Sequence, residues 1–209
     1  MITAMSAWYA VKAGAVFAAI LVIVLATVRA NHPFARFGPA NQVTTLRAAL
    51  VALVAGLVGE RNLPAAGTGA AATSLIVTAL DGVDGWLARR GRMTSGFGAR
   101  FDMEVDALLV LVLSLLAWQY GKAGGWILLA GLLRYLFVAA GWILPFLRRE
   151  TPPSLRAKTI CVLQIVGLSV VILPIVTPPW STWLAAALLT VLAYSFLVDV
   201  RWLWQHRSG

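Results

Sequence analysis

Acidic side chains gather in one short part of this chain. Of its eight acids, five lie between residues 81 and 106. Asp81 and Asp84 are three residues apart and therefore share one face of a helix. Asp102 and Asp106 are four apart and share a face of the next helix. Two antiparallel helices joined by a short loop can bring both faces together, so four carboxylates would converge from two rigid elements.

A convergence of carboxylates predicts a site for hard cations. Oxygen ligands favour Mg²⁺, Mn²⁺ or Ca²⁺, and no His or Cys lies between residues 81 and 106, which argues against zinc. Gly85 and Gly98 adjoin the acids, where either a ligand or a neighbouring helix approaches the backbone closely. Acids that hold metals beside arginines suit a polyphosphate, because metals bridge some of its oxygens and arginine binds others. Three arginines stand in the expected connecting loop: Arg89, Arg90 and Arg92.

The composition indicates that these acids lie in a membrane protein. The 209 residues are 60% apolar and 12% charged, whereas a soluble domain is about half apolar and about a quarter charged. A helix needs about 20 apolar residues to cross a bilayer, and lipid requires each crossing segment to be helical. Seven such spans are predicted: 8–28, 43–59, 66–88, 101–120, 125–147, 158–177 and 180–203.

Seven spans leave room for one all-α membrane domain with short connections. We interpret the first span as a retained anchor, because it lacks a basic leading region and is long for a signal peptide; cleavage is the alternative. The expected organisation is an N-terminal anchor helix and juxtamembrane segment at 1–38 and a six-span catalytic domain at 39–209.

Basic residues predict the orientation. Alternating span ends place thirteen Lys and Arg on one face and three on the other, so the basic face is expected to be cytoplasmic. The acid cluster lies on that same face, in the cell (plasma or inner) membrane. A net charge of +9 would indicate nucleic acid in a soluble protein, but here it fits basic cytoplasmic ends beside anionic lipid, and no nucleic acid partner is expected.

Basic residues around the connection between the fifth and sixth spans form a second candidate site. We expect them to bind the phosphate of an acceptor or an anionic lipid; simple positive-inside bias is the competing account. They are Arg148, Arg149, Arg156 and Lys158. Two further charges stand apart. Glu104 points away from the other acids and is expected beside the loop arginines, and Arg134, in the middle of the fifth span, must face a cavity or a partner helix.

The acid segment resembles the signature of a known family. Residues 81–106 satisfy the pattern D-x2-D-G-x2-A-R-x8-G-x3-D-x3-D of the CDP-alcohol phosphotransferases (CDP-alcohol phosphatidyltransferases), integral membrane enzymes of phospholipid synthesis. The likeness extends weakly to Asn41, Thr44 and Arg47, and to Lys158-Thr159 with Gln164. It implies a core of six spans, here the second to the seventh, with the first span as an extra helix.

The resemblance also implies a reaction and roles. An acceptor hydroxyl attacks the phosphorus nearer the alcohol of a CDP-alcohol, and CMP leaves. Asp81, Asp84 and Asp102 would hold two divalent ions, Mg²⁺ or Mn²⁺, and Asp106 would join the site as the general base. The nucleotide would lie against Asp84 and against small or cationic residues near it: Thr44, Gly85, Ala88, Arg89 and Gly98. For Thr44, helix packing is the competing account. Membrane lipids and a second copy of the chain, in a homodimer, are the expected partners.

The substrates are less defined than the reaction class. A CDP-diacylglycerol donor with a small polar acceptor is favoured, and a soluble CDP-amino-alcohol acting on diacylglycerol is the alternative. Members that use glycerol phosphate usually carry Lys after the last Asp, where this chain has Ala107. Inositol, inositol phosphate, serine and other polyol phosphates stay open. A cation transporter would need acids along a path through the bilayer, and a membrane prenyltransferase lacks the Asp-Gly-x-x-Ala-Arg element.

Overall fold

Helices make up the regular structure of the described chain. The computed structural model describes residues 6–31, 34, 36–60, 65–91, 93–149, 151–152 and 154–207. Within these residues there are seven α-helices, two 3₁₀ segments and no strand. The elements are α1 (Ala7–Asn31), α2 (Pro39–Gly56), α3 (Ala66–Arg90), α4 (Gly96–Gln119), η1 (Gly125–Ile127), α5 (Leu128–Ile143), η2 (Pro145–Arg148), α6 (Leu155–Val171) and α7 (Trp180–Gln205).

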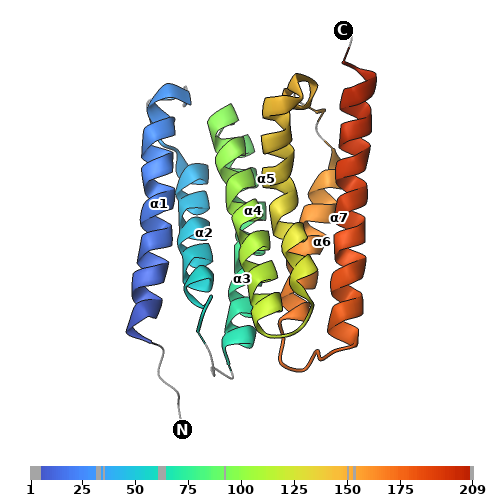
Figure 1. Ribbon diagram of the computed structural model, residues 1–209. Coiled ribbons are helices and arrows are strands. Elements are labelled where there is room, and N and C mark those ends of the chain that lie inside the picture. Colours follow the sequence, from blue (N-terminus) through green and yellow to red (C-terminus); the bar gives the residue numbers. More distant parts are fainter. Residues whose placement is uncertain are drawn as a thin grey trace.

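The helices run side by side with alternating direction (Figure 1). At the centre, α2 and α6 each pack against both α3 and α4, whereas α1, α5 and α7 lie at the periphery. The end of α3 and the start of α4 meet at one end of the bundle, which we call the site end. The helices that carry the acids, α3 and α4, are therefore packed between α2 and α6. This packing fixes the direction of their side chains.

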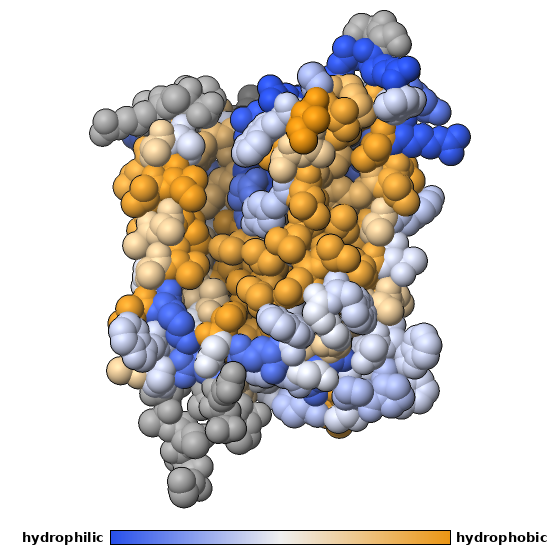
Figure 2. Space-filling view, viewed as in Figure 1, coloured by the Kyte–Doolittle hydropathy of each residue, from blue (hydrophilic) through white to orange (hydrophobic). Residues whose placement is uncertain are grey.

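On the face that Figure 2 shows, an apolar band crosses the middle of the bundle, and polar residues gather towards its two ends. Four helical segments of the described chain are long and apolar enough to cross a membrane: Ala7–Val28, Ala66–Arg90, Gly125–Ile143 and Trp180–Gln205. Of the other three helices, α2 and α6 have 18 and 17 residues, and α4 carries four charges near its start. The chain is a multi-pass membrane protein, and crossing by α2, α4 and α6 stays a prediction from the sequence.

The helix boundaries differ from the predicted spans where polar residues continue a helix. α3 extends through Arg89 and Arg90, which the sequence placed in a loop; Arg92 lies outside the described residues. α4 begins at Gly96 because the Ser95 hydroxyl caps it, accepting a hydrogen bond from the Gly98 amide at 3.0 Å. The connection is therefore short, and the acids of both helices lie within helical turns whose phase is fixed.

Polar contacts attach α1 to the core at the end opposite the site. The Glu60 carboxylate accepts hydrogen bonds from Lys12 Nζ and Ser6 Oγ, both at 2.7 Å. The bonds from Lys12 and Ser6 lower the pKa of Glu60 to about 2. Gln119, at the end of α4, donates to the Glu60 carbonyl at 2.8 Å. Tyr9 packs where a Cβ on Gly56 would sit, 2.9 Å away, so α1 is joined to α2 by packing as well as by charge.

Candidate active site

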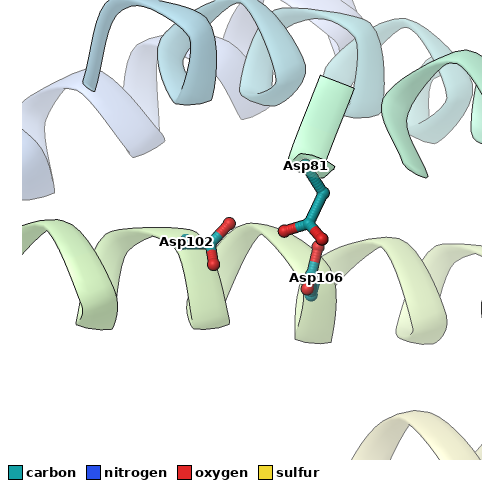
Figure 3. A group of neighbouring side chains, drawn as sticks. All are labelled: Asp81, Asp102 and Asp106. Atoms are coloured by element: carbon teal, nitrogen blue, oxygen red, sulfur yellow. The ribbon is translucent and has the colours of Figure 1, made fainter. Parts of the chain in front are cut away.

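Three carboxylates from two helices converge at the site end. Asp81 projects from α3 towards Asp102 and Asp106 of α4 (Figure 3). One oxygen from each lies within 4.8 Å of the others, close enough for all three to bind one metal ion. The spacings of three and four residues in the sequence predicted this meeting of helix faces. An oxygen-only set of this kind fits Mg²⁺ or Mn²⁺.

Asp84 belongs to the same cluster of charges but stands beside the convergent three. It is 4% exposed. Its Oδ2 accepts hydrogen bonds from Thr44 Oγ1 at 3.0 Å and from Arg47 Nη1 at 2.6 Å. Of the four expected metal ligands, three converge, and the fourth, Asp84, accepts hydrogen bonds from two side chains of α2.

Arg47 joins all four aspartates. Its side chain is fully buried in α2. Nη1 lies 3.4 Å from Asp81 Oδ1 and also bonds Asp102, and Nη2 lies 2.5 Å from Asp106 Oδ1. Sequence reasoning placed Arg47 beside Thr44, as a residue that could line the nucleotide site or pack between helices, and gave it no contact with the acids. The signal that could have identified its role is general: a charge inside an apolar span needs partners, and the chain has few acids to offer.

A pocket of about 220 Å³ opens next to the aspartates. It is lined by every residue that the sequence assigned to the nucleotide, namely Thr44, Asp84, Gly85, Ala88, Arg89 and Gly98, and also by Asp102 and Lys158. A Cβ on Gly98 would lie 3.0 Å from Asn41 Oδ1, and one on Gly85 would lie 3.2 Å from Arg89 Nη1. Glycine at these positions therefore keeps the pocket open between α2, α3 and α4.

The four predicted anion-binding residues do not share one set of partners. Lys158 lines the pocket, with Nζ 3.9 Å from Asp81 Oδ2. Arg156 donates to Ser195 Oγ at 2.6 Å and pairs with Asp199 at 2.5 Å. The other two arginines are held by backbone oxygens: Arg148 bonds the Gly141 carbonyl and Arg149 the His206 carbonyl. Lys158 thus lies near the aspartates, whereas the charge of Arg156 is compensated by Asp199 of α7.

Two expectations about neighbouring groups need correction. Glu104 pairs with Arg134 of α5, not with Arg89 or Arg90 as expected, because it faces away from the other acids on α4. Arg134 accordingly faces a partner helix, as its depth required. A thiol also lies nearer the acids than the sequence indicated, since Cys161 Sγ of α6 is 3.8 Å from Asp106 Oδ2. Cys161 lies one helical turn after Lys158, and this spacing could have placed it there.

Comparison with known proteins identifies the chemistry to which this geometry belongs. Residues 37–196 match the model of the CDP-alcohol phosphatidyltransferases. No curated protein and no solved structure matches the chain. The match covers α2 to α6 and most of α7, so it includes every helix around the aspartates and leaves out α1.

Proposed function

The chain belongs to the CDP-alcohol phosphatidyltransferase family, and we propose that it transfers a phosphatidyl group from CDP-diacylglycerol to the hydroxyl of a small polar alcohol, with release of CMP. Members of this family are transferases of substituted phosphate groups, so the chain is an enzyme and not a cation transporter. The observation that carries the proposal is the convergence of Asp81, Asp102 and Asp106 beside the pocket that the motif residues line.

The carboxylates fit a divalent metal site. Asp81, Asp84 and Asp102 would hold two ions, Mg²⁺ or Mn²⁺, and Asp106 would join them at the site. Such ions, when bound, neutralise the charge of a pyrophosphate and of the CMP that leaves it. Arg47 supports the fit, because one buried cation already holds the four acids close together. The acids are therefore preorganised by α2, which reduces the rearrangement that binding requires.

Asp106 is the proposed general base. Its Oδ1 is bonded to Arg47, and its Oδ2 faces Cys161 at 3.8 Å. A base must reach the acceptor hydroxyl and take its proton as the oxygen attacks. The new bond forms between the acceptor oxygen and the phosphorus next to diacylglycerol. The bond from that phosphorus to the bridging oxygen breaks, and CMP leaves with the oxygen and its electron pair.

The pocket supplies the proposed nucleotide site. Gly85, Ala88 and Gly98 present little side chain, so cytidine can lie against the helix backbone. Arg89, in the last turn of α3, offers a cation to a phosphate. Thr44 is committed to Asp84 by a hydrogen bond and would position that carboxylate for the nucleotide.

Lys158 is the proposed contact for an acceptor that carries an anionic group. It is the member of the predicted basic group that lines the pocket and approaches an aspartate. Arg148, Arg149 and Arg156 would complete the basic group, from the connection between α5 and α6 and from the start of α6. Because Ala107 replaces the Lys of glycerol phosphate-using members, inositol, inositol phosphate, serine and other polyol phosphates are the acceptors to test first.

The surroundings of the site complete the proposal. Basic residues gather at the site end, so this end faces the cytoplasm by positive-inside bias, in the plasma or inner membrane. Residues 39–209 would form the catalytic domain, with 1–38 as an anchor. A homodimer is the proposed assembly.

Amide variants test the roles of two aspartates separately. Asp102→Asn should abolish CMP release and weaken the Mg²⁺-dependent binding of CDP-diacylglycerol, because it removes a ligand oxygen. Asp106→Asn should keep nucleotide binding and lose transfer. Glu60→Gln, an acid-to-amide change at the far end of the bundle, serves as the control and should turn over at the parental rate. Parental turnover by Asp102→Asn, or unchanged transfer by Asp106→Asn, would show that the assignment is wrong.

A further inference from the structure

A second, larger hollow lies outside the site. It is an apolar groove of about 550 Å³ between α1, α4 and α5. Figure 2 shows the surface recessed between α1 and the helices beside it, with mainly apolar residues inside. Its walls include Ile20 and Ile23 from α1, Phe101 and Leu108 from α4, and Tyr135 from α5. Because α1 forms one wall and the family match begins at residue 37, this groove depends on the helix that the match leaves out.

The groove and the aspartates occupy opposite faces of α4. Phe97, Phe101 and Leu108 line the groove, and their successive separations of four and seven residues keep them on one helix face. Asp102 and Asp106 point to the other side, towards α2 and α3. A ligand in the groove is therefore separated from the reacting atoms by the body of α4, and it is not the substrate in its reactive position.

The groove has the length of one leaflet. On α1 it extends from Val16 to Thr27, and on α4 from Phe97 to Leu108. Eleven residues of helix rise about 16 Å, which is about half of the roughly 30 Å hydrocarbon core. Thr27 and Phe97 lie at the site end, so the groove covers the leaflet next to the site.

The end of the groove at the site end carries a free positive charge. Arg100 lines it and is exposed, and within the described chain no ion pair or hydrogen bond involves Arg100. Glu104 also lines the groove, but Arg134 neutralises it. An apolar channel of leaflet length with a cation at its polar end matches a phospholipid acyl chain and its phosphate.

We propose that α1 completes a binding site for one acyl chain of an anionic phospholipid from the leaflet that adjoins the active site. The chain lies along α1 and α4, and the lipid phosphate contacts Arg100. This lipid is held and does not react. The proposal stands apart from the catalytic assignment, because it requires neither metal nor nucleotide.

Photolabelling of the full chain in vesicles tests the site. The vesicles contain phosphatidylcholine and a trace of phosphatidylglycerol with a diazirine on its acyl chain, and labelled peptides are mapped by mass spectrometry. We expect label concentrated in residues 16–27 and 97–108. Ala19→Trp fills the groove and should lower this label at least fivefold. Ala18→Trp is the matched control, because Ala18 is also exposed on α1 but does not line the groove; it should keep the label. Ile23→Trp replaces Ala19→Trp if the latter does not fold.

The headgroup contact has its own pair of variants. Arg100→Gln should reduce the preference for the phosphatidylglycerol probe over a phosphatidylcholine probe about fivefold, the ratio that corresponds to ~1 kcal/mol for one basic residue at an anionic surface. Arg201→Gln, an exposed arginine on α7, should not change it. Three results would overturn the proposal: label spread evenly over all lipid-facing helices, loss of label when unlabelled CDP-diacylglycerol is added, or no label in residues 16–27 and 97–108.

Discussion

Replacing Arg47 by methionine removes a buried cation that touches all four aspartates. The arginine side chain is fully buried, and it lies 2.6 Å from Asp84 and 2.5 Å from Asp106. Removing one partner of a buried ion pair costs about 3–5 kcal/mol, because the remaining charge stays without compensation. Here several carboxylates lose the same partner, so we expect a loss at or above the upper end of that range in metal-free protein.

Thermal unfolding in detergent measures this loss. In EDTA, Arg47→Met should unfold on the order of 10 °C below the parent. Mg²⁺ should raise the unfolding temperature of the variant more than that of the parent, because a bound cation replaces the missing charge and stabilises the folded state by mass action. Arg201→Met is the control, since Arg201 is exposed on α7, and it should unfold with the parent.

Two outcomes would refute the reasoning about Arg47. If Arg47→Met unfolded at the parental temperature in EDTA, the arginine would not be holding the acids together. If the loss appeared but Mg²⁺ restored none of it, the acids would not form a site for a divalent cation.

The other predictions concern the pocket and the far end of the bundle. Gly98→Val should weaken CDP binding at least about fivefold, which corresponds to ~1 kcal/mol of binding free energy, because a Cβ there lies 3.0 Å from Asn41 Oδ1. Gly96→Val is the control, since a Cβ there meets nothing within 4 Å, and it should bind CDP normally. Equal titration curves for the two variants would contradict the pocket assignment. The pKa of Glu60 is lowered to about 2, so its stabilising effect is complete above an unfolded pKa of about 4.3 and is lost as pH falls towards 2. Unfolding temperatures of the parent and Glu60→Gln should therefore converge below pH 4, and a constant difference from pH 7 to pH 2 would contradict this.

The aspartate cluster could be predicted because its geometry is mostly local. Spacings of three and four residues fix a helix face whatever the neighbours are, and a short connection forces the two faces together. The family resemblance implied the six residues of the nucleotide pocket, and five of them belong to the same two helices, α3 and α4. The structure places Thr44 beside them through its bond to Asp84.

Contacts between helices distant in the sequence could not be predicted in this way. Arg47 reaches the acids, Cys161 approaches Asp106, and Glu104 pairs with Arg134. Each contact exists because α2, α6 and α5 pack against α4 with one particular rotation about their own axes. Helix rotation about its own axis depends on the packing of apolar side chains, which a single sequence specifies weakly. The same limit applies to Arg156, whose partner lies on α7. A cluster of charges in the sequence, such as the basic group around Arg156, therefore does not predict a shared site unless its members lie on one helix face.

Release of CMP is the direct readout of metal-dependent phosphatidyl transfer by these aspartates. Purified protein is incubated with labelled CDP-diacylglycerol and a panel of polar alcohols, with Mg²⁺, with Mn²⁺ or with EDTA. With a divalent metal and a matching alcohol, CMP and one phosphatidyl product should form together, and neither should form in EDTA. CMP release at the same rate in EDTA, or no release with any alcohol by folded protein supplied with metal, would contradict it.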